Sequence, residues 1–261
     1  MLQRILTSAV GLVVFFILLF ANEIIFSVAI ALVILMAIYE MHKAMSTGGG
    51  IFTASIVSFV ILIAGIIAGK FQPAFAASVM IYMISSIFLH GKKNFKDVYS
   101  AAFTTYFIVF FFSALIKLRV HFNIEGVFTA FIIAWGTDTG AYFCGRFFGR
   151  HKLIPHVSPK KTVEGAVGGV ITAILFVVVY LAVLSSAFEI QTVGGCGYTE
   201  LIILSVIGSV LSQLGDLSAS AIKRDSDVKD FGTLLPGHGG IMDRFDSVAF
   251  IAPLVLYYFA M

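Results

Sequence analysis

The chain has 261 residues, of which 59% are hydrophobic and 12% are charged, and its formal net charge is +3. This composition excludes an ordinary soluble domain, in which charged residues are about twice as frequent. A helix needs about 20 mainly apolar residues to cross the hydrocarbon layer of a membrane, so the chain is best divided into such stretches.

About nine apolar stretches follow one another along the chain, and their lengths are typical of membrane-spanning helices. The sequence therefore predicts an all-α integral membrane protein with about nine transmembrane helices. Their approximate ranges are Ile5–Phe20, Ile24–Tyr39, Ile51–Gly69, Pro73–Leu89, Val98–Ile116, Val127–Phe143, Gly165–Leu184, Leu201–Ile222 and Val248–Ala260.

The positions of Lys and Arg predict how these helices are oriented. With a cytoplasmic N-terminus, only Lys70, Lys117 and Arg119 of the 17 Lys and Arg residues fall on the outer side. Cytoplasmic loops carry an excess of these residues, so we expect the N-terminus inside. Because topology explains most of this charge, the sequence gives no reason to expect nucleic-acid binding.

Residues 1–126 contain plain apolar helices and are expected to form a scaffold, whereas residues 127–261 carry the polar chemistry. Small residues at helical spacing allow the backbones of membrane helices to approach closely. We therefore expect helix packing, rather than ligand contact, from the glycines of the second half, namely Gly136, Gly140, Gly145, Gly149, Gly165, Gly168 and Gly169.

Two acids lie within predicted spans, where an ionised carboxylate is costly unless it has a partner. The hydroxyls of Thr137 and Thr139 could satisfy Asp138, but the depth of Asp138 favours a role in a site. Asp216 lies seven residues before Lys223, on the same helical face. An ion pair with Lys223 and a metal-ligand role are both open for Asp216.

Two further acids, Asp243 and Asp246, begin the last span, directly after the glycine-rich turn Pro236–Gly240. A spacing of three places both carboxylates on one helical face, and carboxylate oxygens suit Mg²⁺ bridging to substrate phosphates. Helix capping is the alternative, because an acid in a first turn is stabilised by the helix dipole.

Several cations, including Lys160 and Lys161, lie in the loop from Arg146 to Thr162. The same loop contains Ser158. Near a metal site these cations would suit a triphosphate or phosphatidate. The sequence has no HExxH motif, no P-loop and no Gly-x-Ser-x-Gly turn, so zinc catalysis, P-loop nucleotide binding and a serine nucleophile are not expected.

The run from Ser220 to Asp246 resembles the pattern of the phosphatidate cytidylyltransferases, also called CDP-diacylglycerol synthases: S-x-x-K-R-x4-K-D-x-G-x2-L-P-x-H-G-G-x-x-D-R-x-D. Every fixed position is met. The stretches Gln213–Asp216, Asp138–Tyr142 and Ser158–Thr162 are also similar to that family. Ala219 departs from it, since many members have an acid there.

The resemblance implies a multi-pass enzyme of the inner (plasma) membrane, commonly a homodimer, whose site faces the cytoplasm and joins CTP to phosphatidate. It implies Mg²⁺ at Asp216, Asp243 and Asp246, with a second cation as an open alternative. Lys223 joins these three acids as a catalytic residue. Substrate contacts are expected from Asp138, Ser158, Lys160, Lys161, Arg224, Lys229, Asp230, His238, Gly239, Gly240 and Arg244.

Two other functions share part of this pattern. An ion-coupled secondary transporter also uses buried acids and glycine-broken helices, but the polar residues here lie at the cytoplasmic ends of the last spans and no mirrored half is present. Another phospholipid-headgroup transferase would show D-G-x2-A-R-x8-G-x3-D-x3-D, which the sequence lacks.

Overall fold

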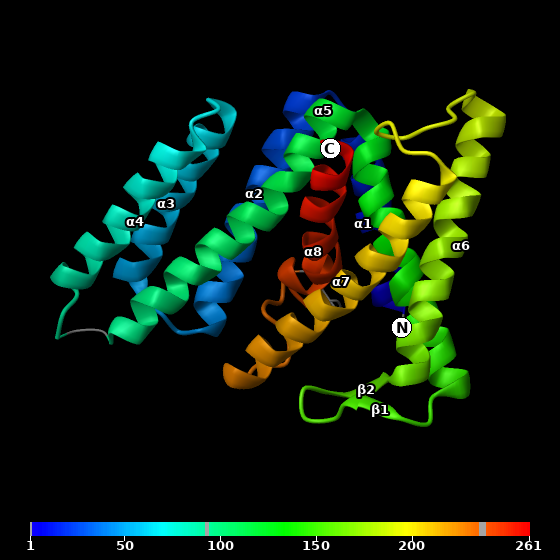
Figure 1. Ribbon diagram of the computed structural model, residues 1–261. Helices are drawn as coiled ribbons and strands as arrows, with labels where there is room; N and C mark the ends of the chain where they lie inside the picture. The colour runs from blue at the N-terminus through cyan, green and yellow to red at the C-terminus, as the bar shows by residue number, and fades with distance from the viewer. Residues whose placement is uncertain (1, 92–93, 235–238) are drawn as a thin grey trace. The chain divides into compact units, whose positions relative to one another are not determined.

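The computed structural model describes residues 2–91, 94–234 and 239–261, and it confirms the predicted all-α class. The described residues form eight helices and one β-hairpin (Figure 1). In chain order these are α1 (Leu2–Phe20), α2 (Glu23–Ala44), α3 (Gly49–Ile67), α4 (Phe71–Phe88), α5 (Phe95–Phe148), β1 (Lys152–Ile154), β2 (Ser158–Thr162), α6 (Val163–Phe188), α7 (Tyr198–Asp225) and α8 (Met242–Phe259).

Six of the described helices, α2 to α7, are long and apolar enough to cross a membrane. Helix α5 has 54 residues, and at a rise of about 1.5 Å per residue it is much longer than one crossing requires. It contains two of the predicted spans, and non-helical backbone angles at Phe122 and Asn123 interrupt it between them. The helical backbone is therefore interrupted between the two predicted stretches.

The chain forms two compact units, each made of two segments. The first unit comprises Met1–Ser113 and Val228–Arg244, and the second comprises Ala114–Asp227 and Phe245–Met261. In the first unit α3 and α4 form an antiparallel pair (Figure 1). The Ser55 and Tyr82 hydroxyls, 2.8 Å apart, form a hydrogen bond between these two helices.

The second unit contains α6 and α7 side by side, and the hairpin β1–β2 lies at the beginning of α6 (Figure 1). The two strands are antiparallel, with Lys152 opposite Thr162. Thr162 also caps α6, because its hydroxyl accepts a hydrogen bond of 3.1 Å from the Gly165 N–H. The last residue of the hairpin is thus also the N-cap of the helix that follows it.

The predicted role of the glycines in helix packing is confirmed where α5 meets α6. A Cβ at Gly136 would lie 2.9 Å from the Cα of Ala173, and one at Gly169 would lie 2.9 Å from the Thr137 carbonyl oxygen. Real Cβ atoms do not approach so closely, so only glycine allows these two backbones to pack. This packing holds the part of α5 that carries Asp138 against α6.

Candidate active site

In the second unit, Asp216 of α7 pairs with Lys161 of β2. The Lys161 Nζ lies 2.6 Å from the Asp216 Oδ2, and the two side chains are 24% and 34% exposed. The partner comes from the hairpin rather than from the next turns of α7, so helical spacing could not have identified it. Since Lys161 is also a predicted substrate contact, this ion pair joins two parts of the predicted site.

Two more predicted acids lie near this pair in the same unit. Asp138, Asp216 and Asp246 interact electrostatically with one another, and Lys161 and Lys223 offset part of their negative charge. Asp246 is only 8% exposed, and its Oδ1 accepts a hydrogen bond of 2.8 Å from the Ser247 N–H. We call Asp138, Asp216 and Asp246, with Lys161, the carboxylate cluster.

The local partner expected for Asp138 is not the one that the structure shows. The Thr137 hydroxyl donates to the Ile133 carbonyl one turn back, at 2.8 Å. The Ser247 hydroxyl of α8 lies 3.4 Å from the Asp138 Oδ1 and donates to it. Asp138 is therefore satisfied in part from another helix, which supports its assignment to a site.

Gly215 explains how α8 reaches the cluster. A Cβ at this position would lie 2.6 Å from the Asp246 carbonyl oxygen and 2.6 Å from the ring of Phe250. Helix α8 therefore passes over α7 at the residue next to Asp216. On the other side of α7, the Gln213 amide donates to the Ala166 carbonyl of α6 at 3.1 Å.

The carboxylate cluster offers oxygen ligands of the kind that Mg²⁺ prefers. Among the described residues, no three His, Cys, Asp or Glu side chains are close enough to form a complete protein cage for a metal ion. Mg²⁺ usually takes one or two protein carboxylates and completes its octahedron with water and substrate phosphates. The chemistry of the cluster fits a cation shared with a phosphate substrate.

Asp243, the remaining predicted metal ligand, belongs to the first unit and has backbone partners. Its Oδ2 accepts hydrogen bonds of 2.9 Å from the N–H groups of Phe231 and Gly240. Between them, Gly239 has a φ of +84°, which favours glycine. Asp243 thus links Phe231 to Gly240 just before α8, so the capping alternative describes part of its role.

Sequence reasoning missed Glu40, which lies near the end of α2 and is 4% exposed. Its two carboxylate oxygens accept hydrogen bonds of 3.0 Å from the N–H groups of Ile241 and Met242, at the beginning of α8. The available signal was an acid directly after an apolar run, at the end of a predicted span. Its partners are about 200 residues away in sequence, so no local pattern reveals them.

The other predicted substrate contacts divide between the two units. Ser158 and Lys160 share β2 with Lys161, and Lys223 and Arg224 lie in the last turn of α7. In the first unit, Asp230 lies beside Gly239, because a Cβ on that glycine would be 3.3 Å from the Asp230 Cβ. Lys229 and Arg244 are exposed. His238 lies outside the described residues.

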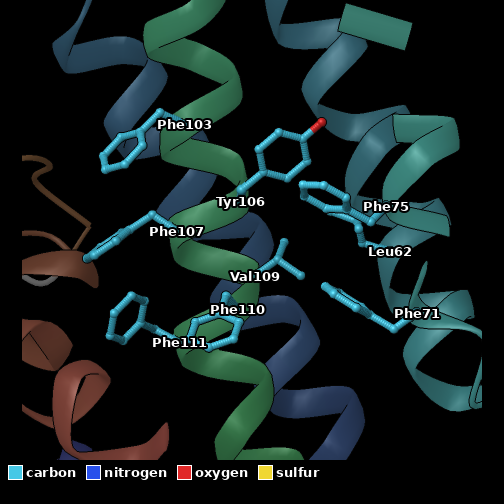
Figure 2. A pocket seen from close by; sticks show the side chains of 9 residues that line it. All are labelled: Leu62, Phe71, Phe75, Phe103, Tyr106, Phe107, Val109, Phe110 and Phe111. Carbon is cyan, nitrogen blue, oxygen red and sulfur yellow. The ribbon is translucent and has the colours of Figure 1, made fainter. Parts of the chain in front are cut away.

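A pocket of about 350 Å³ in the first unit differs in character from these groups (Figure 2). No charged side chain lines it, and the hydroxyl of Tyr106 is its one polar side-chain group. It therefore lacks the groups that phosphate chemistry needs. Its lining consists of Leu62, Phe71, Phe75, Phe103, Tyr106, Phe107, Val109, Phe110 and Phe111.

Comparison with known proteins identifies the class of protein. The sequence matches the cytidylyltransferase family over residues 2–261. It is 32% identical to a phosphatidate cytidylyltransferase of Bacillus subtilis, over 100% of this chain and 98% of that protein. With the protein of that name from Staphylococcus saprophyticus the identity is 34%, over 97% and 96% of the two chains.

A third relative has a higher sequence identity over a shorter region. A phosphatidate cytidylyltransferase of Haemophilus influenzae is 41% identical over 60% of this chain and 55% of its own. Because the family match extends over almost the whole sequence, the chain belongs to the cytidylyltransferase family. This confirms the resemblance predicted from the second half and extends it to the helices before Trp135, where no motif was found.

Proposed function

We propose that the chain transfers a cytidylyl group from CTP to phosphatidate, giving CDP-diacylglycerol and pyrophosphate. The observation that carries this proposal is similarity over nearly the full length to two proteins named phosphatidate cytidylyltransferase. The six apolar helices also suit an enzyme whose lipid substrate lies in a membrane.

In the proposed reaction, a phosphate oxygen of phosphatidate attacks the α-phosphorus of CTP. A new P–O bond forms there, the bond from the α-phosphorus to the oxygen that bridges to the β-phosphate breaks, and pyrophosphate leaves with that oxygen. The attacking group is already an anion, so no covalent enzyme nucleophile is needed. The task of the protein is to place two anions together and to offset their charge.

The carboxylate cluster is the proposed centre of this chemistry. Asp216 and Asp246 would hold Mg²⁺, and the sequence-based proposal includes Asp243 as a third ligand and leaves a second cation open. A bound Mg²⁺ would supply positive charge that offsets the charge developing on the phosphate oxygens. Lys161, paired with Asp216 at 2.6 Å, is suited to exchange that carboxylate for a substrate phosphate.

We propose that the remaining cations bind phosphate. The glycine turn is proposed to shape the nucleotide site. Lysine and arginine donate charge-assisted hydrogen bonds to phosphate oxygens, and backbone N–H groups of glycine turns also accept anions closely. The cations are Lys160, Lys223, Arg224, Lys229 and Arg244, and the turn comprises His238, Gly239 and Gly240.

The proposal places the enzyme in the inner (plasma) membrane, with about nine spans, a cytoplasmic N-terminus and a site that faces the cytoplasm. The distribution of the 17 Lys and Arg residues supports this orientation. A homodimer is proposed from the family resemblance alone.

Conversion of tritiated CTP by the purified protein in detergent tests the proposal. Lipid-soluble label should form when both phosphatidate and Mg²⁺ are present and should be absent when either is omitted. A folded preparation that never transfers label to lipid would contradict the proposed activity. Label formed equally well without phosphatidate would contradict the assignment of the acceptor.

A further inference from the structure

Glu40 is a buried carboxylate, and its hydrogen-bond partners among the described residues are backbone N–H groups of a distant segment. It accepts from Ile241 at Oε1 and from Met242 at Oε2, both at 3.0 Å. A charge that is 4% exposed is tolerated only with such partners. The bonds join the end of α2 to the beginning of α8.

The same carboxylate also contacts the other arm of the loop. A Cβ at Gly232 or at Gly240 would overlap the Glu40 carboxyl group, so this group lies against two glycines that come from opposite ends of the segment. Side chains at either position would displace Glu40. The sequence thus provides space on both arms for one buried acid.

Asp243 also binds backbone N–H groups of this segment, to which it belongs itself. Asp243 Oδ2 accepts from Phe231 on one arm and Gly240 on the other, at 2.9 Å each. Together the two carboxylates bind four backbone N–H groups. We call these two residues with their four partners the loop clamp. It fixes the described residues that flank the predicted nucleotide-binding turn.

The arm beside Glu40 also borders a pocket. A pocket of about 320 Å³ is lined by Glu40 and Lys43 of α2 and by residues 231–234, with Met36 and Tyr39. A change in the position of this arm therefore changes the wall of an open pocket.

We infer that Glu40 is a positioning residue, which holds residues 231–234 and 239–243 in the arrangement that receives CTP. This inference rests on the proposed function, in which that segment shapes the nucleotide site. It gives the N-terminal helices a part in substrate recognition beyond that of a scaffold. Loss of a residue that orients ligand-binding groups typically costs about 10- to 100-fold in affinity or activity.

Steady-state kinetics of Glu40→Gln tests the inference. The amide keeps one acceptor oxygen but turns an NH₂ group toward the second backbone N–H, so one bond is lost and a repulsive contact is created. We expect the KM for CTP to rise by about 10- to 100-fold, with an unchanged KM for phosphatidate. Glu23→Gln, at the exposed beginning of α2, is the matched control and should keep both KM values.

A second pair of variants separates positioning from folding. Ala at position 232 would press on the Glu40 carboxylate, so Gly232→Ala should also raise the KM for CTP. In a Glu40→Ala background that carboxylate is gone, and Gly232→Ala should cause little further change. A purely structural role predicts less folded protein with unchanged KM values.

The outcomes are distinguishable from failure of the proposed function. If wild-type protein does not convert CTP, the proposed function fails first. If wild type is active and folded Glu40→Gln retains the wild-type KM for CTP, the positioning role is overturned. Should Glu40→Gln not fold, a wild-type KM for CTP in Gly232→Ala would overturn it equally.

Discussion

The carboxylate cluster and the loop clamp use the same functional group in opposite ways. In the cluster, the acids interact electrostatically with one another and with two lysines, in addition to the hydrogen bonds that Ser247 donates to them. In the clamp, Glu40 and Asp243 accept only backbone N–H groups in the bonds described above. Bonds to the backbone fix a conformation, whereas side-chain charges can be exchanged for a charged ligand.

This difference divides two acids that are one helical turn apart in sequence. Asp243 and Asp246 both lie near the beginning of α8, yet the first closes a loop and the second faces Asp138 and Asp216. The spacing of three predicted a common role for them as metal ligands. In the hydrogen bonds described, Asp243 accepts from Phe231 and Gly240, whereas Asp246 accepts from Ser247.

The largest effect is expected from neutralising the cluster. Asp216→Asn and Asp246→Asn should each lower kcat by about 10²- to 10³-fold, the usual cost of losing one preorganised electrostatic contact to a transition state. Conversion of labelled CTP by folded protein measures this. Asp225→Asn, at the exposed end of α7, is the matched control, and near-normal turnover in both cluster variants would refute the proposed centre.

Asp243→Asn separates the two roles of this residue. An Asn side-chain oxygen can still accept from Phe231 and Gly240, so the loop clamp should persist while the charge is lost. If Asp243 is also a metal ligand, kcat should fall by about 10²-fold with an unchanged melting temperature. Wild-type kcat in this variant would restrict Asp243 to the clamp.

Gly215→Ala tests the packing that brings α8 to the cluster. The added methyl would overlap the Asp246 carbonyl oxygen and the Phe250 ring, and such overpacking typically costs about 1–3 kcal/mol. Thermal unfolding in detergent should show a lower midpoint. Gly11→Ala, which would have no heavy atom within 4 Å of its Cβ, should not lower it, and equal midpoints for the two variants would contradict the close approach.

Lys161→Ala should have a smaller effect, because several cations are proposed to share the phosphates. We expect kcat/KM for CTP to fall about tenfold, which corresponds to about 1.4 kcal/mol. The exposed Lys229 is not part of the ion pair with Asp216, so Lys229→Ala should lower kcat/KM less than Lys161→Ala does. The reverse order of the two variants would argue against a special role for the pair.

Sequence reasoning predicted the fold class and the family, because both are encoded locally. Apolar runs reveal helices, and the run from Ser220 to Asp246 identifies the family without a structure. The non-helical backbone at Phe122 and Asn123 lies between the two spans predicted for this part of the chain.

The partners of the site residues were harder to predict, since they are set by tertiary packing. Lys161 reaches Asp216 from a β-hairpin, and Ser247 reaches Asp138 from another helix. Glu40 binds a segment about 200 residues away. None of these pairs has a characteristic spacing, so a single sequence cannot reveal them.

The most direct test of the central claim follows two differently labelled CTP molecules in parallel reactions with phosphatidate and Mg²⁺. Attack at the α-phosphorus predicts that α-³²P enters the lipid fraction while γ-³²P appears as pyrophosphate in an equal amount. Both signals should be lost in Asp246→Asn. Entry of γ-³²P into lipid, or undiminished transfer of α-³²P by folded Asp246→Asn, would contradict the account.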